Sequence, residues 1–453
     1  MAGESGRASA ARMCIDFGTA LSKVSICLDP DLPLPMGVRP LAIGAVAGAD
    51  HPLLTPSVIF VDGGRLYFGP VAFEHARNGI DADRDPLLSF KTVLGAKDVS
   101  AALAARIERS IDPTGTLRQR DALVLYLAYL EQLIAEAVRR SDNLPPAVIT
   151  APRRYTSPVW RAGGGVDRAL EVIFAEAAAV SVKLGQLLLS PDGISIAQCT
   201  DALDKAAANP GNALLETGVF EPHAAAATAL AFSKAPTRFV VVFDMGAGTT
   251  DLAAFDFNET TEPPSLTEIT EARQCSALAG DEVDRILIEA LLKKRGARES
   301  SVEEARFLRA SRLAARDLKR EIFTTGRCSL KEGWRTTSLH ISELLTDPNF
   351  RGFQHALGLA IGESLGVVAA RAAAARADVI DVVLAGGGSQ LPFLVDLVHG
   401  TAQARSGGIP LRVEPLSPTS PLYDGIDTYF NDVFPQLAMS IGGALVEMLP
   451  PSR

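Results

Sequence analysis

The chain has 453 residues, of which 47% are hydrophobic and 21% are charged, and its formal net charge is -9. This length accommodates two or three domains, and the hydrophobic content is sufficient for ordinary buried cores. The acidic balance disfavours non-specific binding to nucleic acid or anionic lipid, because both depend on clustered Lys and Arg.

The cysteines and the start of the chain favour a reducing, cytoplasmic setting. Five cysteines are scattered, without a CxxC pair or a Cys/His cluster of zinc spacing. Residues 1–12 are small and polar and lack the apolar core of a signal peptide, and no run of about 18 uncharged apolar residues follows. We expect a flexible tail at residues 1–12 and neither a membrane nor a nucleic-acid partner.

Strand and helix patterns alternate along the chain, which is typical of an α/β protein. Short apolar, β-branched runs indicate buried strands, and longer segments with apolar residues at helical spacing indicate helices. The predicted strands lie in residues 13–28, 147–151, 239–257 and 379–385. The predicted helices lie in residues 118–140, 282–294, 303–323 and 353–377, with an alanine-rich helix at 224–231.

A repeated unit sets the predicted domain organisation. A strand, a turn with Asp-x-Gly and Thr, and a returning strand occur near the N-terminus and again around residue 244, which predicts two similar lobes. We place lobe I at residues 13–235 and lobe II at residues 236–453. Lobe I is expected to carry an insertion at about 153–217, and lobe II a subdomain at about 286–370.

The first glycine turn follows an aspartate that ends an apolar strand. Asp16 is followed by Gly18 and Thr19. Glycine permits a tight turn whose backbone N–H groups converge on phosphate oxygens, and the carboxylate can hold a hydrated cation beside them. An ordinary hairpin turn would have the same pattern.

The second glycine turn is bracketed by two carboxylates. Gly246, Gly248 and Thr249 lie between Asp244 and Asp251. A hairpin needs no more than one such side chain to satisfy its turn amides. The pattern therefore predicts a phosphate cradle together with a cation site.

A triple glycine, residues 386–388, stands between a predicted strand and a predicted helix. Glycines at this place let the backbone approach a base or sugar, and the following helix N-terminus can face negative charge. Taken alone, the triple glycine is equally compatible with a plain strand-to-helix loop.

These three elements, in this order, resemble the actin-like ATPases, which include sugar kinases, actin and the seventy-kilodalton heat-shock (DnaK-like) chaperones. The ATPase domain of the chaperones is the most similar of these. Further segments that resemble it are TPSVI (55–59), FGPVA (68–72), SFKTVLG (89–95), AVITAP (147–152), FEPHAAA (220–226), AGDEVD (279–284) and SIGGAL (440–445). The resemblance implies an actin-like ATPase fold, with ribonuclease H-like duplicated lobes and a nucleotide cleft between them.

The resemblance also implies roles for individual residues around ATP or ADP with magnesium. Asp16 and Asp251 would hold the waters around the metal ion. The residues implied to wrap the phosphates are Gly18, Thr19, Ala20, Gly246, Ala247, Gly248 and Thr249. The residues implied to contact the adenosine are Lys319, Gly386, Gly387 and Gly388.

Four residues are implied to act in hydrolysis: Lys91, Glu221, Asp244 and Thr249. Lys91 would meet the γ-phosphate and the attacking water, while Glu221 and Asp244 would orient that water or accept its proton, because in-line phosphoryl transfer needs mainly positioning and charge neutralisation. From the local sequence, Lys91 is equally well an exposed lysine, and Glu221 a favourable helix N-terminal carboxylate.

Four positions depart from the chaperone pattern. Ala20 and His223 stand where the family has threonine, Gln390 stands where an arginine covers the base, and Arg316 replaces a glutamate. The phosphate-binding pattern is retained, whereas purine recognition is expected to be altered. We expect His223 to be a packed histidine rather than a catalytic one.

The sequence therefore predicts an ATP-binding switch that hydrolyses slowly and acts with an unidentified protein partner in protein quality control or complex assembly. Because Arg453 follows shortly after the last predicted ATPase helix, we expect a relative without the peptide-binding domain, similar to the YegD-like chaperones of bacteria. Three alternatives stay open: an actin-, MreB- or FtsA-like filament or scaffold, a small-molecule kinase, and a non-catalytic module held closed by nucleotide.

Overall fold

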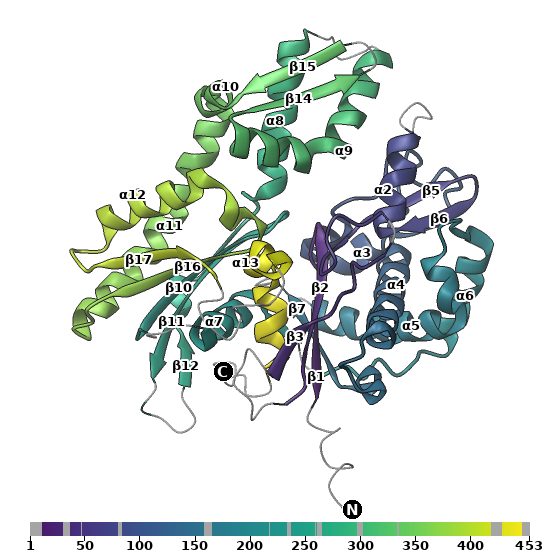
Figure 1. The fold of residues 1–453 in the computed structure, drawn as a ribbon, viewed down its shortest axis with the longest axis horizontal. Helices are drawn as coiled ribbons and strands as arrows, with labels where there is room; N and C mark the ends of the chain where they lie inside the picture. Colours follow the sequence, from purple (N-terminus) through teal and green to yellow (C-terminus); the bar gives the residue numbers. More distant parts are fainter. Residues whose placement is uncertain are drawn as a thin grey trace, which may run out of the picture. The chain divides into compact units, whose positions relative to one another are not determined.

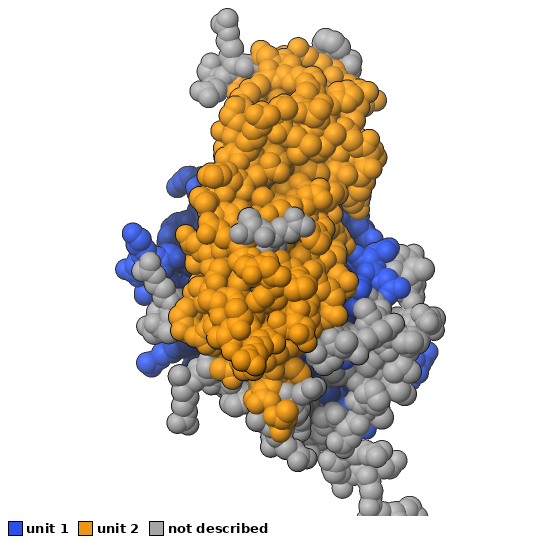
Figure 2. Space-filling model, turned by 90° about the vertical axis from the view of Figure 1, so that its left-hand side faces the viewer, with its two compact units in different colours: residues 1–76, 84–234, 417–448 blue, residues 77–83, 235–416, 449–453 orange. Residues whose placement is uncertain are grey.

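The computed structural model describes most of the chain, namely residues 11–29, 37–46, 48–79, 84–157, 165–216, 218–232, 237–258, 260, 265–296, 302–332, 335–417 and 428–445. Most of the predicted tail, residues 1–12, lies outside this part. The chain divides into two compact units, which Figure 2 colours separately. Unit 1 consists of residues 1–76, 84–234 and 417–448, and unit 2 of residues 77–83, 235–416 and 449–453.

Unit 1 is built on a six-stranded sheet with the order β3-β2-β1-β7-β9, and β4 pairs with β2 (Figure 1). Its strands are β1 (Arg12–Asp16), β2 (Leu21–Cys27), β3 (Val38–Pro40), β4 (Thr55–Pro56), β7 (Arg153–Ser157) and β9 (Val219–Phe220). β1 and β2 form the antiparallel hairpin predicted around the first glycine turn. β7 runs parallel to β1, and β9 runs parallel to β7.

Unit 2 is built on a sheet of the same order, β12-β11-β10-β16-β17, and β13 pairs with β11. Its strands are β10 (Phe239–Met245), β11 (Thr250–Asn258), β12 (Ser265–Glu268), β13 (Gln274–Ser276), β16 (Ile380–Ala385) and β17 (Leu411–Pro415). Here too a hairpin surrounds a glycine turn, and the next two strands run parallel to its first strand. This correspondence confirms the repeat predicted from the two turns.

The helices of unit 1 cover its sheet and enclose most of its apolar core (Figure 1). α4 is apolar on nearly all sides, because residues 122–130 are all buried. The helical segments are α2 (Gly69–Asn78, whose end is assigned to unit 2), η3 (Phe90–Gly95), α3 (Val99–Ala104), α4 (Gln119–Arg140), η4 (Pro146–Thr150), α5 (Val166–Leu184), η5 (Gly185–Leu189), α6 (Ile196–Ala208), α7 (Glu221–Phe232) and α13 (Thr428–Ala444). A small sheet of β5 (Ile59–Asp62), β6 (Arg65–Phe68) and β8 (Ile194–Ser195) completes the unit.

The helices of unit 2 confirm the three long helices predicted there. α8 has acidic residues in its first turn, basic residues in its last turn and a left-handed glycine, Gly296, as its C-cap. The remaining elements are η6 (Thr270–Ala272), α8 (Gly280–Arg295), α9 (Val302–Thr325), the hairpin β14 (Arg327–Glu332) and β15 (Arg335–His340), α10 (Ile341–Thr346), α11 (Pro348–Ala374), η7 (Gly387–Gln390) and α12 (Pro392–Arg405). α8 and α9 pack with the hairpin, and together they overlap the segment 286–370 predicted as a subdomain, although α8 begins before it.

The strand predicted at residues 147–151 is wrong. The segment forms the 3-10 helix η4, in which Val148 alone is buried. The proline in its first turn has no backbone N–H to donate to a neighbouring strand, which disfavours a strand here. The strand that runs parallel beside β1 is β7. Its first two residues are arginines, which form ion pairs with Glu131 and Glu216. β7 also lies at the start of the segment predicted as an insertion, 153–217, which therefore contributes a strand to the central sheet.

The C-terminal helix differs from the predicted lobe boundary, which placed residues 236–453 in one lobe. α13 packs on β1, β2 and α7, and residues 417–448 are assigned to unit 1. The close approach depends on two glycines. A Cβ on Gly442 would lie 1.8 Å from the carbonyl oxygen of Ala224, and one on Gly443 would lie 2.2 Å from Cys14 Sγ.

Two stretches of the described residues, 166–189 and α11, are long and apolar enough to cross a membrane, although none was predicted from the sequence. In each, 44% of the tested window is buried inside the structure. Buried core helices of soluble proteins pass the same test. α5 packs against α4 and α6, and α11 packs against α12.

The packing of α13 predicts a large effect of a single methyl group. Gly442→Ala should lower the free energy of unfolding by about 1–3 kcal/mol or more. The added methyl group would overlap the backbone carbonyl of Ala224 in α7, which can move only if the helix shifts. The matched variant Gly366→Ala places its methyl group on α11, where no described atom lies within 4 Å. It should raise stability by roughly 0.5–1 kcal/mol. Urea unfolding followed by circular dichroism measures both, and equal effects would contradict the packing described for α13.

Candidate functional site

The carboxyl ends of three parallel strands bring the predicted residues of unit 1 to one edge of its sheet. β1 ends at Asp16, β7 ends at Ser157, and β9 ends directly before Glu221. Open α/β sheets bind ligands at this edge, where the strands give way to loops and helix N-termini. Strand topology thus brings residues distant in the sequence to the same edge.

Asp16 is buried, and both of its carboxylate oxygens accept hydrogen bonds. Lys23 Nζ donates to Oδ2 over 2.7 Å, and Thr156 Oγ1 donates to Oδ1 over 2.8 Å. Neither partner was predicted from the sequence. Lys23 was detectable in principle, because it is the one charged residue in the apolar strand β2. Thr156 was not, because its strand had been placed elsewhere.

The first glycine turn is held by the TPS segment that follows it. A Cβ on Gly18 would lie 2.1 Å from the carbonyl oxygen of Leu21, so the turn excludes any larger residue. Ser57 Oγ donates to the Gly18 carbonyl over 2.7 Å, and the Ser57 amide donates to the Ala20 carbonyl over 2.9 Å. The resemblance of residues 55–57 to the chaperone pattern thus corresponds to a structural role.

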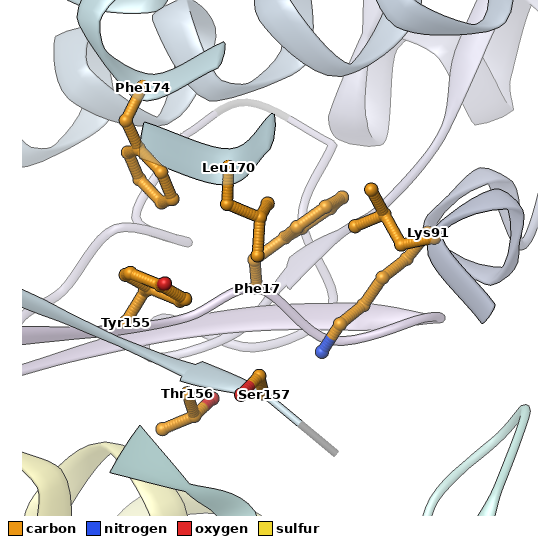
Figure 3. Close-up of a pocket in the computed structure, with 8 residues that line it drawn as sticks. Phe17, Lys91, Tyr155, Thr156, Ser157, Leu170 and Phe174 are labelled. Carbon is orange, nitrogen blue, oxygen red and sulfur yellow. The ribbon is translucent and has the colours of Figure 1, made fainter. Parts of the chain in front are cut away.

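Lys91 is buried, so its interpretation as an exposed lysine is wrong. Its Nζ donates to Glu221 Oε1 over 2.8 Å and lies 5.7 Å from the centre of the Phe17 ring. Figure 3 shows the side chain extending from η3 toward the end of β7, where Thr156 and Ser157 lie. The cavity in this view measures about 10 Å³, roughly the space for one water molecule.

His223 lies near the start of α7, two residues after Glu221. Its ring centre is 5.9 Å from that of Phe220, and the residue is half-buried. This position agrees with the packed histidine expected from the sequence.

In unit 2, the two aspartates of the second turn face each other across the hairpin. Asp244 of β10 is the register partner of Asp251 of β11, and the same row continues to Ala385 on one side and Cys275 on the other. Directly opposite residues share one face of a sheet, and like charges there repel. Because both carboxylates are buried, the pair favours a compensating positive charge.

The second glycine turn is joined to the N-terminus of α8. The Gly246 amide donates to the Thr249 carbonyl over 2.9 Å, as in a tight hairpin. The amides of Gly280 and Asp281 donate to the carbonyls of Gly246 and Ala247 over 3.1 and 2.8 Å. The AGDEVD segment therefore fixes residues 246–249 from outside.

Lys319 reaches the same place from α9. Its Nζ donates to the Gly280 carbonyl over 3.0 Å and lies 2.9 Å from Asp284 Oδ1. Burial raises the pKa of Asp284, and the nearby Lys319 acts in the opposite direction. Lys319 thus lies against α8, whose N-terminus is hydrogen-bonded to the second glycine turn. Arg316, which lies on α9 like Lys319, is exposed.

The triple glycine packs against the end of β10. Gly386 has φ +76°, and a Cβ there would lie 2.3 Å from Asp244 Oδ1. A Cβ on Gly388 would lie 2.3 Å from Met245 Cγ, whereas one on Gly387 would meet no described atom within 4 Å. Gly387 therefore faces open space, and Gln390 after it is exposed. The structure thus brings Lys319, the aspartates 244 and 251, the 246–249 turn and the 386–388 loop together within unit 2.

The implied magnesium ion can be tested against these residues. Among the described residues, no group of three or more His, Cys, Asp or Glu side chains is placed to hold a metal ion directly. Asp16 fits less well, because the Lys23 ammonium 2.7 Å from its Oδ2 already compensates the charge that a cation would need. Asp244 and Asp251 fit a hydrated divalent cation, since two facing carboxylates supply the negative charge that such an ion requires.

Two sheets of one strand order, each with a buried aspartate before a glycine turn, fit the duplicated lobes of an actin-like ATPase. A comparison with protein families agrees, because residues 217–406 match the family model described as Hsp70 protein. The match covers less than half of the chain, from the end of unit 1 through most of unit 2. It supports an assignment to the Hsp70/actin-like ATPase superfamily and nucleotide binding of the Hsp70 kind. No curated protein matches the chain.

The burial of the cysteines predicts one reactive thiol in the folded protein. Cys275 is exposed and the other four are buried, and burial raises the pKa of Cys199 to about 12 and that of Cys328 to about 11. Because the thiolate is the reactive form, a thiol-reactive dye near pH 7 should label one cysteine quickly, and all five in denaturant. Cys275→Ser should abolish the fast reaction. A second fast thiol would contradict the burial described here.

The buried pair of Lys91 and Glu221 predicts strong coupling. Lys91→Met or Glu221→Gln alone should lower stability by about 3–5 kcal/mol, because each leaves a buried charge without its partner. The double variant should lose clearly less than the sum of the two losses. Urea unfolding of the four proteins measures the coupling, and additive losses would argue against the pair. The exposed pair of Lys205 and Asp201 is the control, and Lys205→Met should leave stability nearly unchanged.

Proposed function

We propose that the protein binds ATP and ADP with magnesium, hydrolyses ATP slowly, and uses the bound nucleotide to switch conformation. The observation that carries this proposal is the convergence in unit 2 of the 246–249 turn, the N-terminus of α8 and the 386–388 loop around two buried carboxylates. This constellation lies within the segment that matches the Hsp70 family. Three backbone elements and an acidic pair exceed what a structural hairpin requires.

In unit 2, we assign the phosphates to the turn and the cation to the acidic pair. Backbone N–H groups of Gly248 and Thr249 are suited to phosphate oxygens, since glycine turns form concave anion sites. Asp244 and Asp251 would hold the waters of a magnesium ion, which when bound neutralises charge on the phosphates. Gly387 would leave room for the adenosine, and Lys319 would contact the ribose.

In unit 1, we assign the reacting phosphate to Lys91 and the first turn. Backbone groups of residues 18–20 would contact the phosphates, and the Lys91 ammonium would neutralise the γ-phosphate as water attacks and the bond to ADP breaks. Glu221 is held by Lys91, so it is suited to orient the water. Proton transfer to Glu221 or Asp244 completes hydrolysis to ADP and phosphate.

The proposed biological role is that of a chaperone-type switch. Nucleotide-dependent change of the two units would be read by a protein partner in protein quality control or complex assembly. Five free cysteines fit a reducing compartment, and we propose the cytoplasm. Slow turnover suits a switch, because each nucleotide state must last long enough for the partner to respond.

Calorimetric titration with ATP and ADP in the presence of magnesium tests this function. Both nucleotides should bind, and ATP turnover should lie below the 1–100 s⁻¹ typical of kinases. Gly386→Ala should weaken binding at least about tenfold, or roughly 1.4 kcal/mol, because its methyl group would displace Asp244.

The matched control is Gly407→Ala, another glycine of unit 2 with positive φ, at which an added Cβ would meet no described atom within 4 Å. It shares the backbone strain of Gly386→Ala but lies in the loop before β17, and its affinity should stay within about twofold of the parent protein. A folded protein that binds neither nucleotide at millimolar concentration would exclude the proposal. ATP-dependent sedimentation would instead favour the filament alternative.

A further inference from the structure

We infer that the Lys23 ammonium is a permanent cation of the proposed nucleotide site. In unit 1 it supplies the positive charge that, under the proposed function, a metal ion supplies in unit 2. The inference rests on the proposed function and extends it to the metal requirement. Its consequence is nucleotide binding that persists when divalent cations are removed.

The duplication of the fold carries this inference, because it provides an internal comparison. In unit 1, Asp16 of β1 is the register partner of Lys23 of β2. In unit 2, Asp244 of β10 is the register partner of Asp251 of β11. Both pairs lie in the hairpin beside the glycine turn, on corresponding strands of the two sheets. The same position thus holds an ammonium in one unit and a carboxylate in the other.

The geometry places the Lys23 ammonium directly beside the turn. Its side chain is 11% exposed, and that of Asp16 is 4% exposed. Nζ lies 2.7 Å from Asp16 Oδ2, and a Cβ on Gly18 would lie 3.3 Å from Nζ. A cation this close to the proposed phosphate-binding backbone attracts phosphate strongly, because neighbouring protein lowers the effective dielectric.

The pair also makes Asp16 a poor partner for a metal ion, because the adjacent ammonium already compensates its charge and repels a second cation. One oxygen is taken by Lys23 and the other by Thr156. A lysine is covalently attached, so chelation cannot remove it, whereas the ion proposed at Asp244 and Asp251 is exchangeable. The alternative is a purely structural ion pair that stabilises the hairpin and leaves the metal requirement unchanged.

The experiment compares the affinity for ADP with and without divalent cations. The full-length parent protein, Lys23→Met, Lys23→Arg and the exposed control Lys205→Met are titrated with ADP in excess magnesium or in EDTA, after circular dichroism has established that each is folded. For each protein, the ratio of the dissociation constant in EDTA to that in magnesium reports the metal requirement. This ratio is insensitive to losses that are the same under both conditions.

We expect a ratio below about ten for the parent protein, Lys23→Arg and Lys205→Met. Lys23→Met should raise the ratio at least about tenfold, because Asp16 then becomes available to the hydrated metal ion. If the ratio is the same in Lys23→Met and the parent protein, Lys23 is structural and the inference fails alone. A ratio above about 100 in the parent protein also overturns it, even if Lys23→Met does not fold. Absence of ADP binding in magnesium overturns the proposed function as well.

Discussion

A buried aspartate at or directly before the last residue of the central strand of each sheet is the feature on which the arrangement of both units depends. A charge in this position is costly unless it is paired or hydrogen-bonded. In unit 1 the compensation comes from the two neighbouring strands, with Lys23 on the antiparallel side and Thr156 on the parallel side. The hairpin and the parallel strand are therefore both needed to compensate the charge of Asp16. The strand order thus determines which polar side chains meet at this edge of the sheet.

Close backbone approach is the second feature that the two units share. Gly18 in unit 1 and Gly386 in unit 2 each lie where an added Cβ would meet a backbone or carboxylate oxygen closer than 2.5 Å. These glycines do not merely provide flexible turns, because their absent side chains let the loops close over the strand ends. The absence of side chains at Gly442 and Gly443 likewise lets the helix α13 pack closely against α7 and β1.

Much of the fold could be predicted because its local patterns are strong. The two hairpins and the long helices α4, α8, α9 and α11 follow apolar periodicity, which reports burial directly. β7 could not be found in this way, because Arg153 and Arg154 replace apolar residues and are compensated by distant carboxylates. The position of α13 was equally hidden, since its packing partners lie hundreds of residues away in the sequence. In the site, Asp16 was recognised, but its partner Lys23 was not.

The two units have kept one scaffold but differ in the charges placed on it. Unit 1 carries Lys23 and Lys91, each tied to a carboxylate, whereas unit 2 carries two carboxylates in the row where unit 1 has a salt bridge. Under the proposed function, the cation at Asp244 and Asp251 is present with ATP and with ADP, whereas the γ-phosphate beside Lys91 in unit 1 is released after hydrolysis. A conformational response to hydrolysis must begin where the charge changes. The proposed switch therefore senses hydrolysis in unit 1, at Lys91 and Glu221, and retains the cation in unit 2.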